Sequence, residues 1–274
     1  SALVYDVVQH PYFQRLRRIR QLGMSEWVYP GATHTRFHHA LGAMNLMVKA
    51  LDTLRGKGVE ITDEEKEAAI LGILMHDIGH GPYSHTLEYT LAQGVNHEDI
   101  SIMLMERMNI EFGGALRLAI DIFRGDYHKK PFLHQLISGE LDMDRLDYLM
   151  RDSFYTGVSE GIVGVDRLIH MLNVKGGDLV VEEKGIYSVE KFLVARRLMY
   201  WQVYLHKTVL SAEFMIARIL QRAKSLAMQG EKLASGNAHA DNVAPCLLGG
   251  FTLVRSTNPL DIIKIDSPSE LYAT

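Results

Sequence analysis

The feature that most constrains the fold is a series of segments in which apolar residues recur every three or four positions. In residues 37–54, for example, Leu41, Met44, Val48 and Leu51 fall on one helical face and polar residues occupy the rest. Similar patterns cover residues 63–79, 97–108, 115–123 and 133–151. The pattern predicts a mainly α-helical chain, with helices bundled around an apolar core.

Capping residues mark the expected ends of these helices. Thr62 and Glu65 have the spacing of a capping box, and Asn96 can cap a helix that begins near His97. Three further ends are expected: Gly23, closing an amphipathic helix over residues 11–22; Ser84, opening one that runs to Leu91; and Ser188, opening a long helix over residues 189–229.

One stretch departs from the helical pattern. In residues 172–187, β-forming residues alternate with Gly-Gly-Asp and Lys-Gly turns, which predicts a small β-hairpin. After Gly230 the composition shifts to Gly, Ala, Ser and Asn, and only GFTLVRS indicates a strand. We therefore expect one domain over residues 1–230 and a poorly defined segment over residues 231–274.

Composition excludes several classes of protein. With 274 residues and 47% hydrophobic content, the chain can bury a full core, and its single cysteine, Cys246, cannot form an intrachain disulfide. No signal peptide is recognisable, and no apolar run approaches the roughly 20 residues of a membrane-spanning helix. The net charge of −4 argues against a nucleic-acid-binding surface. These features predict a cytoplasmic protein without membrane or nucleic-acid partners.

Histidines concentrate where chemistry is expected. Seven of the 13 lie in the first third of the chain: His34, His38, His39, His76, His80, His85 and His97. The doublet His76-Asp77 offers a nitrogen and an oxygen ligand at the end of an apolar helix, within the run HDIGHGPYSH. The alternative for the doublet alone is a buried core histidine beside a solvated aspartate.

Two other segments can supply further metal ligands. RFHHALG carries Arg36, His38 and His39, and LDMDRLDYLMRD carries four aspartates on an otherwise apolar helix: Asp142, Asp144, Asp147 and Asp152. Such aspartates are costly unless they are satisfied. Salt bridges with Arg145 and Arg151 are the alternative, and it stays open for Asp147 and Asp152.

Taken in order, six sequence blocks resemble those of the HD-domain deoxynucleoside triphosphate triphosphohydrolases. They are QRLRRIRQLG, YPGATHTRFHHALG, HDIGHGPYSH, NHEDIS, DMDRLDYLMRD and YLHK, and the resemblance covers about residues 9–210. It implies an HD-domain helical bundle, with a metal site within residues 36–152 and a nucleotide-contacting helix at 189–229. It also implies hydrolysis of deoxynucleoside triphosphates to deoxynucleoside and triphosphate.

The resemblance assigns the ligands of one divalent metal to His39, His76, Asp77 and Asp144, and leaves His38 outside the set. Mixed nitrogen and oxygen ligands suit manganese, iron or zinc, with magnesium as a second ion at most. The metal would acidify a water that attacks the α-phosphorus. The implied catalytic residues are Arg36, His80, His85, Glu88 and His97, with glutamate at position 88 where the family has aspartate.

The resemblance also implies contacts to nucleotides. Phosphates would be bound by Arg145, Tyr148, Arg196 and Lys207, and the deoxyribose by Gln21, Leu22, Asp152 and Tyr204. Arg145 stands where lysine is expected, and Leu205 replaces a polar residue near the base. Gln14 and Arg17 match residues of an allosteric site for GTP or dGTP at the interface of a dimer or tetramer, although Gln9 replaces an acidic residue there. The alternative is a solvated basic helix face.

Two rival functions remain open. An HD phosphohydrolase could act on a nucleoside monophosphate, a cyclic nucleotide or an alarmone, but it would not need the sugar pocket formed by Gln21, Asp152 and Tyr204. A nucleotide sensor without catalysis would not need the complete ligand set together with His80, His97 and Arg36.

Overall fold

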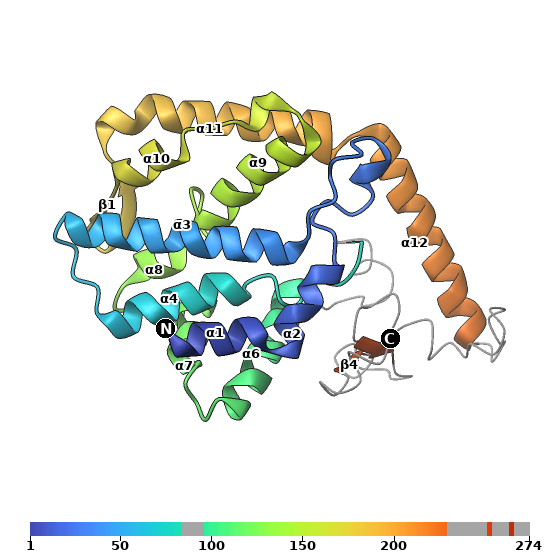
Figure 1. Ribbon diagram of the computed structural model, residues 1–274, viewed down its shortest axis with the longest axis horizontal. Helices are drawn as coiled ribbons and strands as arrows, with labels where there is room; N and C mark the ends of the chain where they lie inside the picture. The colour runs from blue at the N-terminus through green and yellow to red at the C-terminus, as the bar shows by residue number, and fades with distance from the viewer. Residues whose placement is uncertain (84–95, 229–250, 254–262, 266–274) are drawn as a thin grey trace.

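The computed structural model describes residues 1–83 and 96–228 and the backbone of two strands after them, and it confirms the mainly α-helical fold (Figure 1). The helices are α1 (Ala2–Gln9), α2 (Pro11–Gln14), α3 (Arg36–Gly56), α4 (Asp63–Met75), α6 (His97–Glu111), α7 (Arg117–Arg124), α8 (Pro131–Gln135), α9 (Met143–Thr156), α10 (Val165–Met171), α11 (Ile186–Met199) and α12 (Lys207–Met228). The strands are β1 (Leu172–Lys175), β2 (Asp178–Val181), β3 (Phe251–Leu253) and β4 (Ile263–Ile265). Both strand pairs are antiparallel hairpins.

Helix α3 organises the bundle. It runs between α4 on one side and α9 on the other, and α11 lies beyond α9 (Figure 1). Its inward face carries small residues, Ala40, Ala43 and Ala50, that are completely buried. Small side chains let two helices approach α3 closely. A residue on this face therefore lies within reach of both α4 and α9.

The capping predictions at Thr62 and Asn96 are confirmed. At the start of α4 the backbone N–H of Thr62 donates to Glu65 at 2.8 Å, and the N–H of Glu65 donates back to Thr62 at 3.1 Å. At the start of α6, Asn96 accepts from the backbone N–H of Asp99 at 2.7 Å. The hairpin is confirmed as β1 and β2. The helix expected from Ser84 to Leu91 lies outside the described residues.

The helix predicted over residues 11–22 is wrong beyond its first turn. α2 ends at Gln14, a 3-10 helix, η1 (Arg15–Arg18), follows, and Ile19 is extended. The reason is a tertiary pairing, since Arg20 forms a β-bridge with Thr35 and the carbonyl of Ile19 accepts from Arg36 N–H at 2.9 Å. This pairing ties the N-terminal segment to the start of α3.

Two other long helices are divided. Residues 133–151 form the end of α8 and the start of α9, because Asp142 caps α9 by accepting from Arg145 N–H at 2.7 Å and also accepts from Gly139 N–H at 3.0 Å. The helix predicted at 189–229, with Ser188 as its cap, instead begins at Ile186 after Gly185. It passes into a π-helical turn, η5 (Tyr200–Tyr204), and α12 follows in a new direction (Figure 1).

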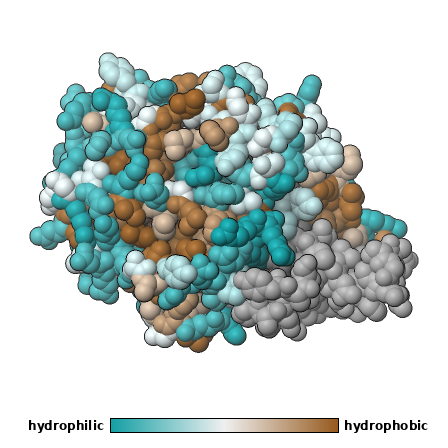
Figure 2. Space-filling view, in the orientation of Figure 1, coloured by the Kyte–Doolittle hydropathy of each residue, from teal (hydrophilic) through white to brown (hydrophobic). Residues whose placement is uncertain are grey.

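The surface is polar but not uniformly so. Figure 2 shows hydrophilic residues over most of one face, with hydrophobic residues gathered in its upper and central parts. Tyr187 and Trp201, on α11 and η5, are 79% and 71% exposed. Within the described residues, no helix combines the length and the apolar character needed to cross a membrane.

Candidate metal centre and adjoining pocket

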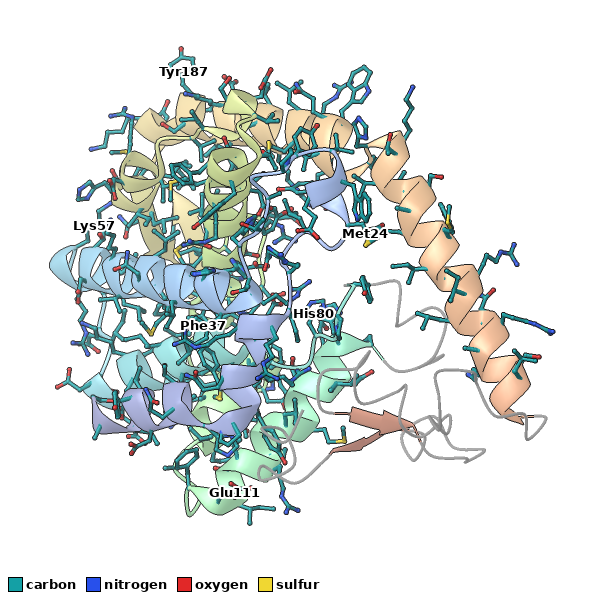
Figure 3. The ribbon with its side chains drawn as sticks, turned by 45° about the vertical axis from the view of Figure 1, so that its right-hand side comes forward. Met24, Phe37, Lys57, His80, Glu111 and Tyr187 are labelled. Atoms are coloured by element: carbon teal, nitrogen blue, oxygen red, sulfur yellow. The ribbon has the colours of Figure 1, made fainter. Side chains whose placement is uncertain are left out.

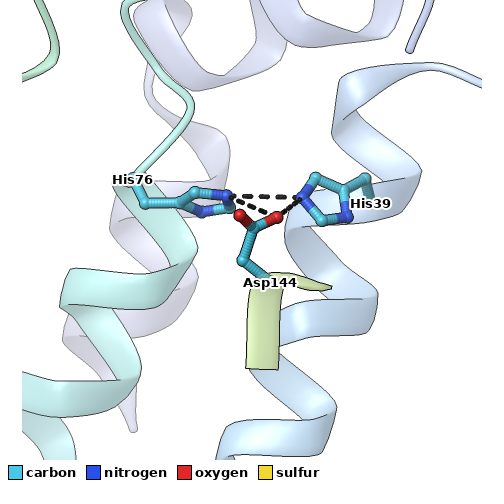
Figure 4. A group of neighbouring side chains, drawn as sticks. All are labelled: His39, His76 and Asp144. Atoms are coloured by element: carbon cyan, nitrogen blue, oxygen red, sulfur yellow. Dashed lines mark hydrogen bonds and ion pairs between the residues drawn. The ribbon is translucent and has the colours of Figure 1, made fainter. Parts of the chain in front are cut away.

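Three predicted ligands meet at one point (Figure 4). His39 comes from the first turn of α3, His76 from the end of α4, and Asp144 from the first turn of α9. The Nε2 atom of His39 lies 3.3 Å from His76 Nε2 and 3.0 Å from Asp144 Oδ1, and His76 Nε2 lies 3.5 Å from the same oxygen. All three ligand atoms lie within 4.8 Å of one another.

The fourth predicted ligand, Asp77, borders this cluster. Its Oδ1 lies 3.4 Å from His76 Nε2, and its Oδ2 lies 3.9 Å from His39 Nε2. The same carboxylate forms a buried ion pair with Arg36 at the start of α3. The charge of Arg36 therefore compensates part of the negative charge gathered around the cluster.

The Nδ1 atom of each imidazole ring, on the side away from the cluster, contacts an oxygen acceptor. His39 Nδ1 lies 2.8 Å from Asp147 Oδ2, and His76 Nδ1 lies 2.6 Å from the carbonyl oxygen of Ile73. Acceptors at Nδ1 place the ring protons there, so both Nε2 lone pairs face the cluster. Asp147 is buried and accepts from Arg151 Nε and Nη2 at 2.8 and 2.9 Å. Asp147 therefore forms the salt bridge with Arg151 that was the alternative to a metal-ligand role, and it also holds the ring of His39.

The electrostatics fit a cation. Burial lowers the pKa of His39, but its hydrogen bonds with Asp144 and Asp147 outweigh that effect and raise its pKa to about 10. Burial lowers the pKa of His76 too, but the negative charge of Asp77 outweighs burial, so the pKa of His76 is also raised. At both rings the nearby carboxylates favour a positive charge, as they would favour a bound cation. Two imidazole nitrogens and carboxylate oxygens form a donor set for manganese, iron or zinc.

His80 and His97 lie beside the cluster. His80 Nε2 is 3.4 Å from Asp77 Oδ1, and the two rings stack with centroids 3.9 Å apart and planes at 18°. Burial and the nearby charge of Arg36 lower the pKa of His80 to about 3, so its ring is neutral at neutral pH. Figure 3 shows His80 on the side of the molecule that faces α12.

A pocket of about 780 Å³ extends from the metal cluster to α12. Asp77 and Asp144 line it together with Arg36, His80 and His97. Five of the predicted substrate contacts line it as well: Gln21, Leu22, Tyr148, Asp152 and Tyr204. The pocket also has a wall that no sequence motif indicated, formed by Tyr200, Glu213, Phe214, Arg218 and Gln221. No local motif marks these residues, because the turn at η5 brings them to the pocket.

A hydrogen-bonded group forms one side of this pocket. Asp152 Oδ2 accepts from Tyr204 Oη at 2.9 Å, and Asp152 Oδ1 lies 2.6 Å from His34 Nε2. Burial, and then the charge of Asp152, raise the pKa of Tyr204 well above its usual range, so the phenol stays a donor. Gln21 Oε1 is buried and has no hydrogen-bond partner among the described residues.

Other predicted site residues lie elsewhere. Arg145 binds Asp142 and the carbonyl of Gly139, and Arg196 lies over the Tyr200 ring at 5.8 Å. Lys207 is exposed in the first turn of α12. Unlike Tyr148, none of these three basic residues lines the pocket.

The predicted allosteric pair, Gln14 and Arg17, lies on α2 and η1. Arg17 Nε donates to Gln14 Oε1 at 2.7 Å, and its guanidinium lies 3.7 Å from the centre of the Phe37 ring. Two predicted catalytic residues, His85 and Glu88, lie outside the described residues.

Comparison with known proteins gives two family matches. The HD domain matches residues 36–152, and a region described as HD associated matches residues 163–240. The uncharacterised protein YwfO of Bacillus subtilis is 34% identical over 279 residues, covering 98% of this chain and 61% of that protein. A Dictyostelium discoideum protein named deoxynucleoside triphosphate triphosphohydrolase SAMHD1 homolog is 31% identical over 232 residues, covering 78% of this chain and 45% of that protein.

A crystal structure described as a phosphohydrolase from Bacteroides thetaiotaomicron shares 61% sequence identity with the chain. The two superpose with a TM-score of 0.83 over 86% of this chain and 58% of the other. The chain thus spans about half to three fifths of the length of these similar proteins.

Proposed function

Since the chain belongs to the HD-domain family, we propose that it is a metal-dependent phosphohydrolase that converts deoxynucleoside triphosphates to deoxynucleoside and triphosphate. The observation that carries the proposal is that Asp144 of the His39, His76 and Asp144 cluster lines the pocket, together with the neighbouring Asp77. The pocket continues past Gln21, Asp152 and Tyr204 to α12. The pocket would therefore place a metal site, a phosphate-binding group at Arg36 and a sugar site next to one another.

His39, His76, Asp77 and Asp144 would hold the divalent metal. Bound there, the metal would acidify a water and polarise a phosphoryl oxygen. His80 lines the pocket beside Asp77 and stacks on His97, which places two imidazoles where a proton could be passed on during hydrolysis. Arg36 lines the same end, where a guanidinium binds phosphate oxygens well. By family resemblance, His85 protonates the leaving oxygen and Glu88 orients a histidine.

Four residues of the pocket have the properties that a deoxyribose site needs. The unpaired oxygen of Gln21 and the carboxylate of Asp152 are acceptors for a sugar hydroxyl. Tyr204 and Leu22 line the same pocket and would occupy the space that a 2′-hydroxyl requires. The printed name of the Dictyostelium relative supports the same substrate class.

Activation and assembly belong to the same proposal. Gln14 and Arg17 would read a guanine nucleotide between subunits of a dimer or tetramer. Sedimentation with and without GTP or dGTP tests assembly, and the rate of hydrolysis in the same mixtures tests activation. We expect the nucleotide to increase both the size of the oligomer and the rate.

One observation favours a second candidate. Arg145, Arg196 and Lys207, which were expected to bind the triphosphate, do not line the pocket. A substrate with fewer phosphates, such as a nucleoside monophosphate or a cyclic nucleotide, needs fewer cationic contacts. The product analysis below distinguishes the two.

The test is to incubate the purified chain anaerobically with manganese and each deoxynucleoside triphosphate, with and without GTP or dGTP. Ion-exchange chromatography should show deoxynucleoside and intact triphosphate, and neither should form with the Asp77→Ala variant. Release of pyrophosphate or single phosphates, or turnover of monophosphates, cyclic nucleotides or alarmones alone, would establish another HD phosphohydrolase. A metal-bound protein that turns over none of these compounds would be a sensor.

A further inference from the structure

His34 occupies a position that neither the metal cluster nor a direct substrate contact explains. It lies in the loop between the 3-10 helix at Ser25–Trp27 and α3, is only 1% exposed, and does not line the pocket. Its Nε2 lies 2.6 Å from Oδ1 of Asp152, which is equally buried. Its ring stacks on Tyr155 with centroids 4.5 Å apart and planes at 15°. One hydrogen bond and one ring-stacking contact thus hold the imidazole of His34 behind the pocket wall.

Asp152 is held from both sides. A carboxylate only accepts hydrogen bonds, so His34 donates from Nε2 to Oδ1 and Tyr204 donates from Oη to Oδ2. Each carboxylate oxygen has a second acceptor position, and Asp152 lines the pocket. A hydroxyl group entering the pocket therefore meets an acceptor whose direction is already set.

The main chain of His34 supports the second acceptor. The backbone N–H of Gln21 donates to the carbonyl oxygen of His34 at 3.1 Å. Gln21 Oε1, buried in the same pocket, has no partner among the described residues. One residue therefore connects the two acceptors that the sugar site offers, through its ring on one side and its carbonyl on the other.

The loop that carries His34 is itself anchored. Tyr29 Oη donates to the carbonyl oxygen of Gln202 at 2.6 Å, which ties the loop to the turn that carries Tyr204. A Cβ atom at Gly31 would lie 2.5 Å from the carbonyl oxygen of Tyr155, so only glycine permits this close approach. Packing of this kind keeps a supporting residue in place before a substrate arrives.

We propose that His34 is a positioning residue that orients Asp152 and, through Gln21, sets the preference of the site for a nucleotide with a 3′-hydroxyl. This inference rests on the proposed function. A purely structural role would affect the stability of the chain but not its choice between substrates that differ in that hydroxyl alone.

The test compares kcat and KM for a deoxynucleoside triphosphate and for the matching 2′,3′-dideoxy compound. In the full wild-type chain the ratio of the two kcat/KM values should favour the 3′-hydroxyl, and His34→Leu should reduce that ratio about tenfold, which is the effect of losing one charge-assisted hydrogen bond. His34→Gln, whose amide N–H can reach Asp152, should retain most of it. His128→Gln is the matched control, because His128 is exposed and lies outside the pocket.

A second pair of variants covers the case in which His34→Leu does not fold. Tyr155→Leu removes the stacked ring and should also lower the ratio, whereas Tyr155→Phe keeps the ring and should preserve it. An unchanged ratio in folded His34→Leu or in Tyr155→Leu, or equal losses in His34→Leu and His34→Gln, overturns the inference. If the wild-type chain releases no triphosphate from any deoxynucleoside triphosphate, the proposed function itself is wrong. If the wild type is active and only the ratio fails to change in the variants, the inference about His34 alone is wrong.

Discussion

At the scale of single residues, buried aspartates do most of the positioning. Asp147 receives two hydrogen bonds from Arg151 and contacts His39 at 2.8 Å, while Asp142 caps α9. Gly42 makes room for this arrangement, since a Cβ atom there would lie 2.0 Å from Asp147 Oδ1. The proposed metal centre therefore depends on residues that do not themselves reach the metal.

The first prediction concerns Asp147. Replacing it with asparagine should weaken metal binding by about 10- to 100-fold, because an amide holds the Nδ1 proton of His39 less firmly than a carboxylate does. Competition with a coloured chelator measures the change. Asp166→Asn is the control, since the Asp166 side chain is 79% exposed and its partner is Lys49. Equal metal affinity of wild type and Asp147→Asn would contradict the role given to Asp147.

At the scale of elements, α4 is fixed at both ends. At its start, Glu65 accepts from Tyr127 Oη and Lys130 Nζ, both at 2.7 Å, in addition to the capping box. At its end, Ser101 of α6 donates to the carbonyl oxygen of His76 at 2.8 Å and accepts from Gly79 N–H at 2.9 Å. These contacts set the direction in which His76 and Asp77 leave the helix.

The second prediction follows from the charge of Glu65. Burial opposes ionisation, but the hydrogen bonds from Lys130, Thr62 and Tyr127 lower the pKa of Glu65 from 4.5 to about 2. Because the folded-state pKa is the lower one, the stabilisation is present above pH 4.5 and is lost as the pH falls toward 2. Glu65→Gln should therefore lower the free energy of unfolding by about 1–2 kcal/mol at neutral pH and by less at low pH.

Urea unfolding near neutral pH and near pH 3 measures this difference. Glu64→Gln is the matched control, since it removes the same charge from an exposed position in the same turn. A loss for Glu65→Gln that is equally large at both pH values would show that the carboxylate charge is not the cause.

The third prediction concerns the contact of the α4 end with α6. A Cβ atom at Gly79 would lie 2.2 Å from the His97 carbonyl oxygen and 2.4 Å from the Ser101 nitrogen. Gly79→Ala should therefore destabilise the chain by about 1–3 kcal/mol and disturb the stacked His80 and His97 pair. Gly56→Ala, with no atom within 4 Å of the new Cβ, should be neutral or slightly stabilising. Thermal unfolding of both variants checks this, and equal melting temperatures would count against the contact.

At the scale of the whole molecule, the cluster joins three helices that are distant in sequence. His39, His76 and Asp144 belong to α3, α4 and α9, and α3 packs on both other helices. The family matches and the likeness to a known phosphohydrolase structure cover this core. Binding of a metal here would add a direct link between helices that already meet through apolar packing and through the His39–Asp147 and Arg36–Asp77 contacts.

The fourth prediction is that the metal stabilises the whole bundle. A ligand that binds only the folded chain adds about 2.7 kcal/mol when its concentration is 100 times its Kd. Removing metal with a chelator should therefore lower Tm, and restoring manganese, iron or zinc should raise it. His76→Ala should abolish the response without losing the fold. An unchanged Tm for the metal-loaded and stripped wild type would argue against a site at this cluster.

The amino-acid sequence alone was enough to predict the features that depend on neighbours along the chain. The apolar spacing of residues 37–54 and the capping pairs at Thr62 and Asn96 gave correct helices, because caps and amphipathic faces are local. Glycines at 176 and 177, with positive φ, close the predicted hairpin. Family resemblance added His39, His76 and Asp144, which the structure places together.

The remaining features depend on contacts between distant parts of the chain. Residues 11–22 stop being helical because Arg20 pairs with Thr35, and the long C-terminal helix turns at η5, where Leu205 N–H donates to the carbonyl oxygen of Tyr200 at 2.8 Å. That turn creates the α12 wall of the pocket. Likewise, Asp147 and His34 gain their roles from partners 108 and 118 residues away. Local pattern cannot reveal such roles, since burial and a distant partner decide whether a polar side chain is solvated or held.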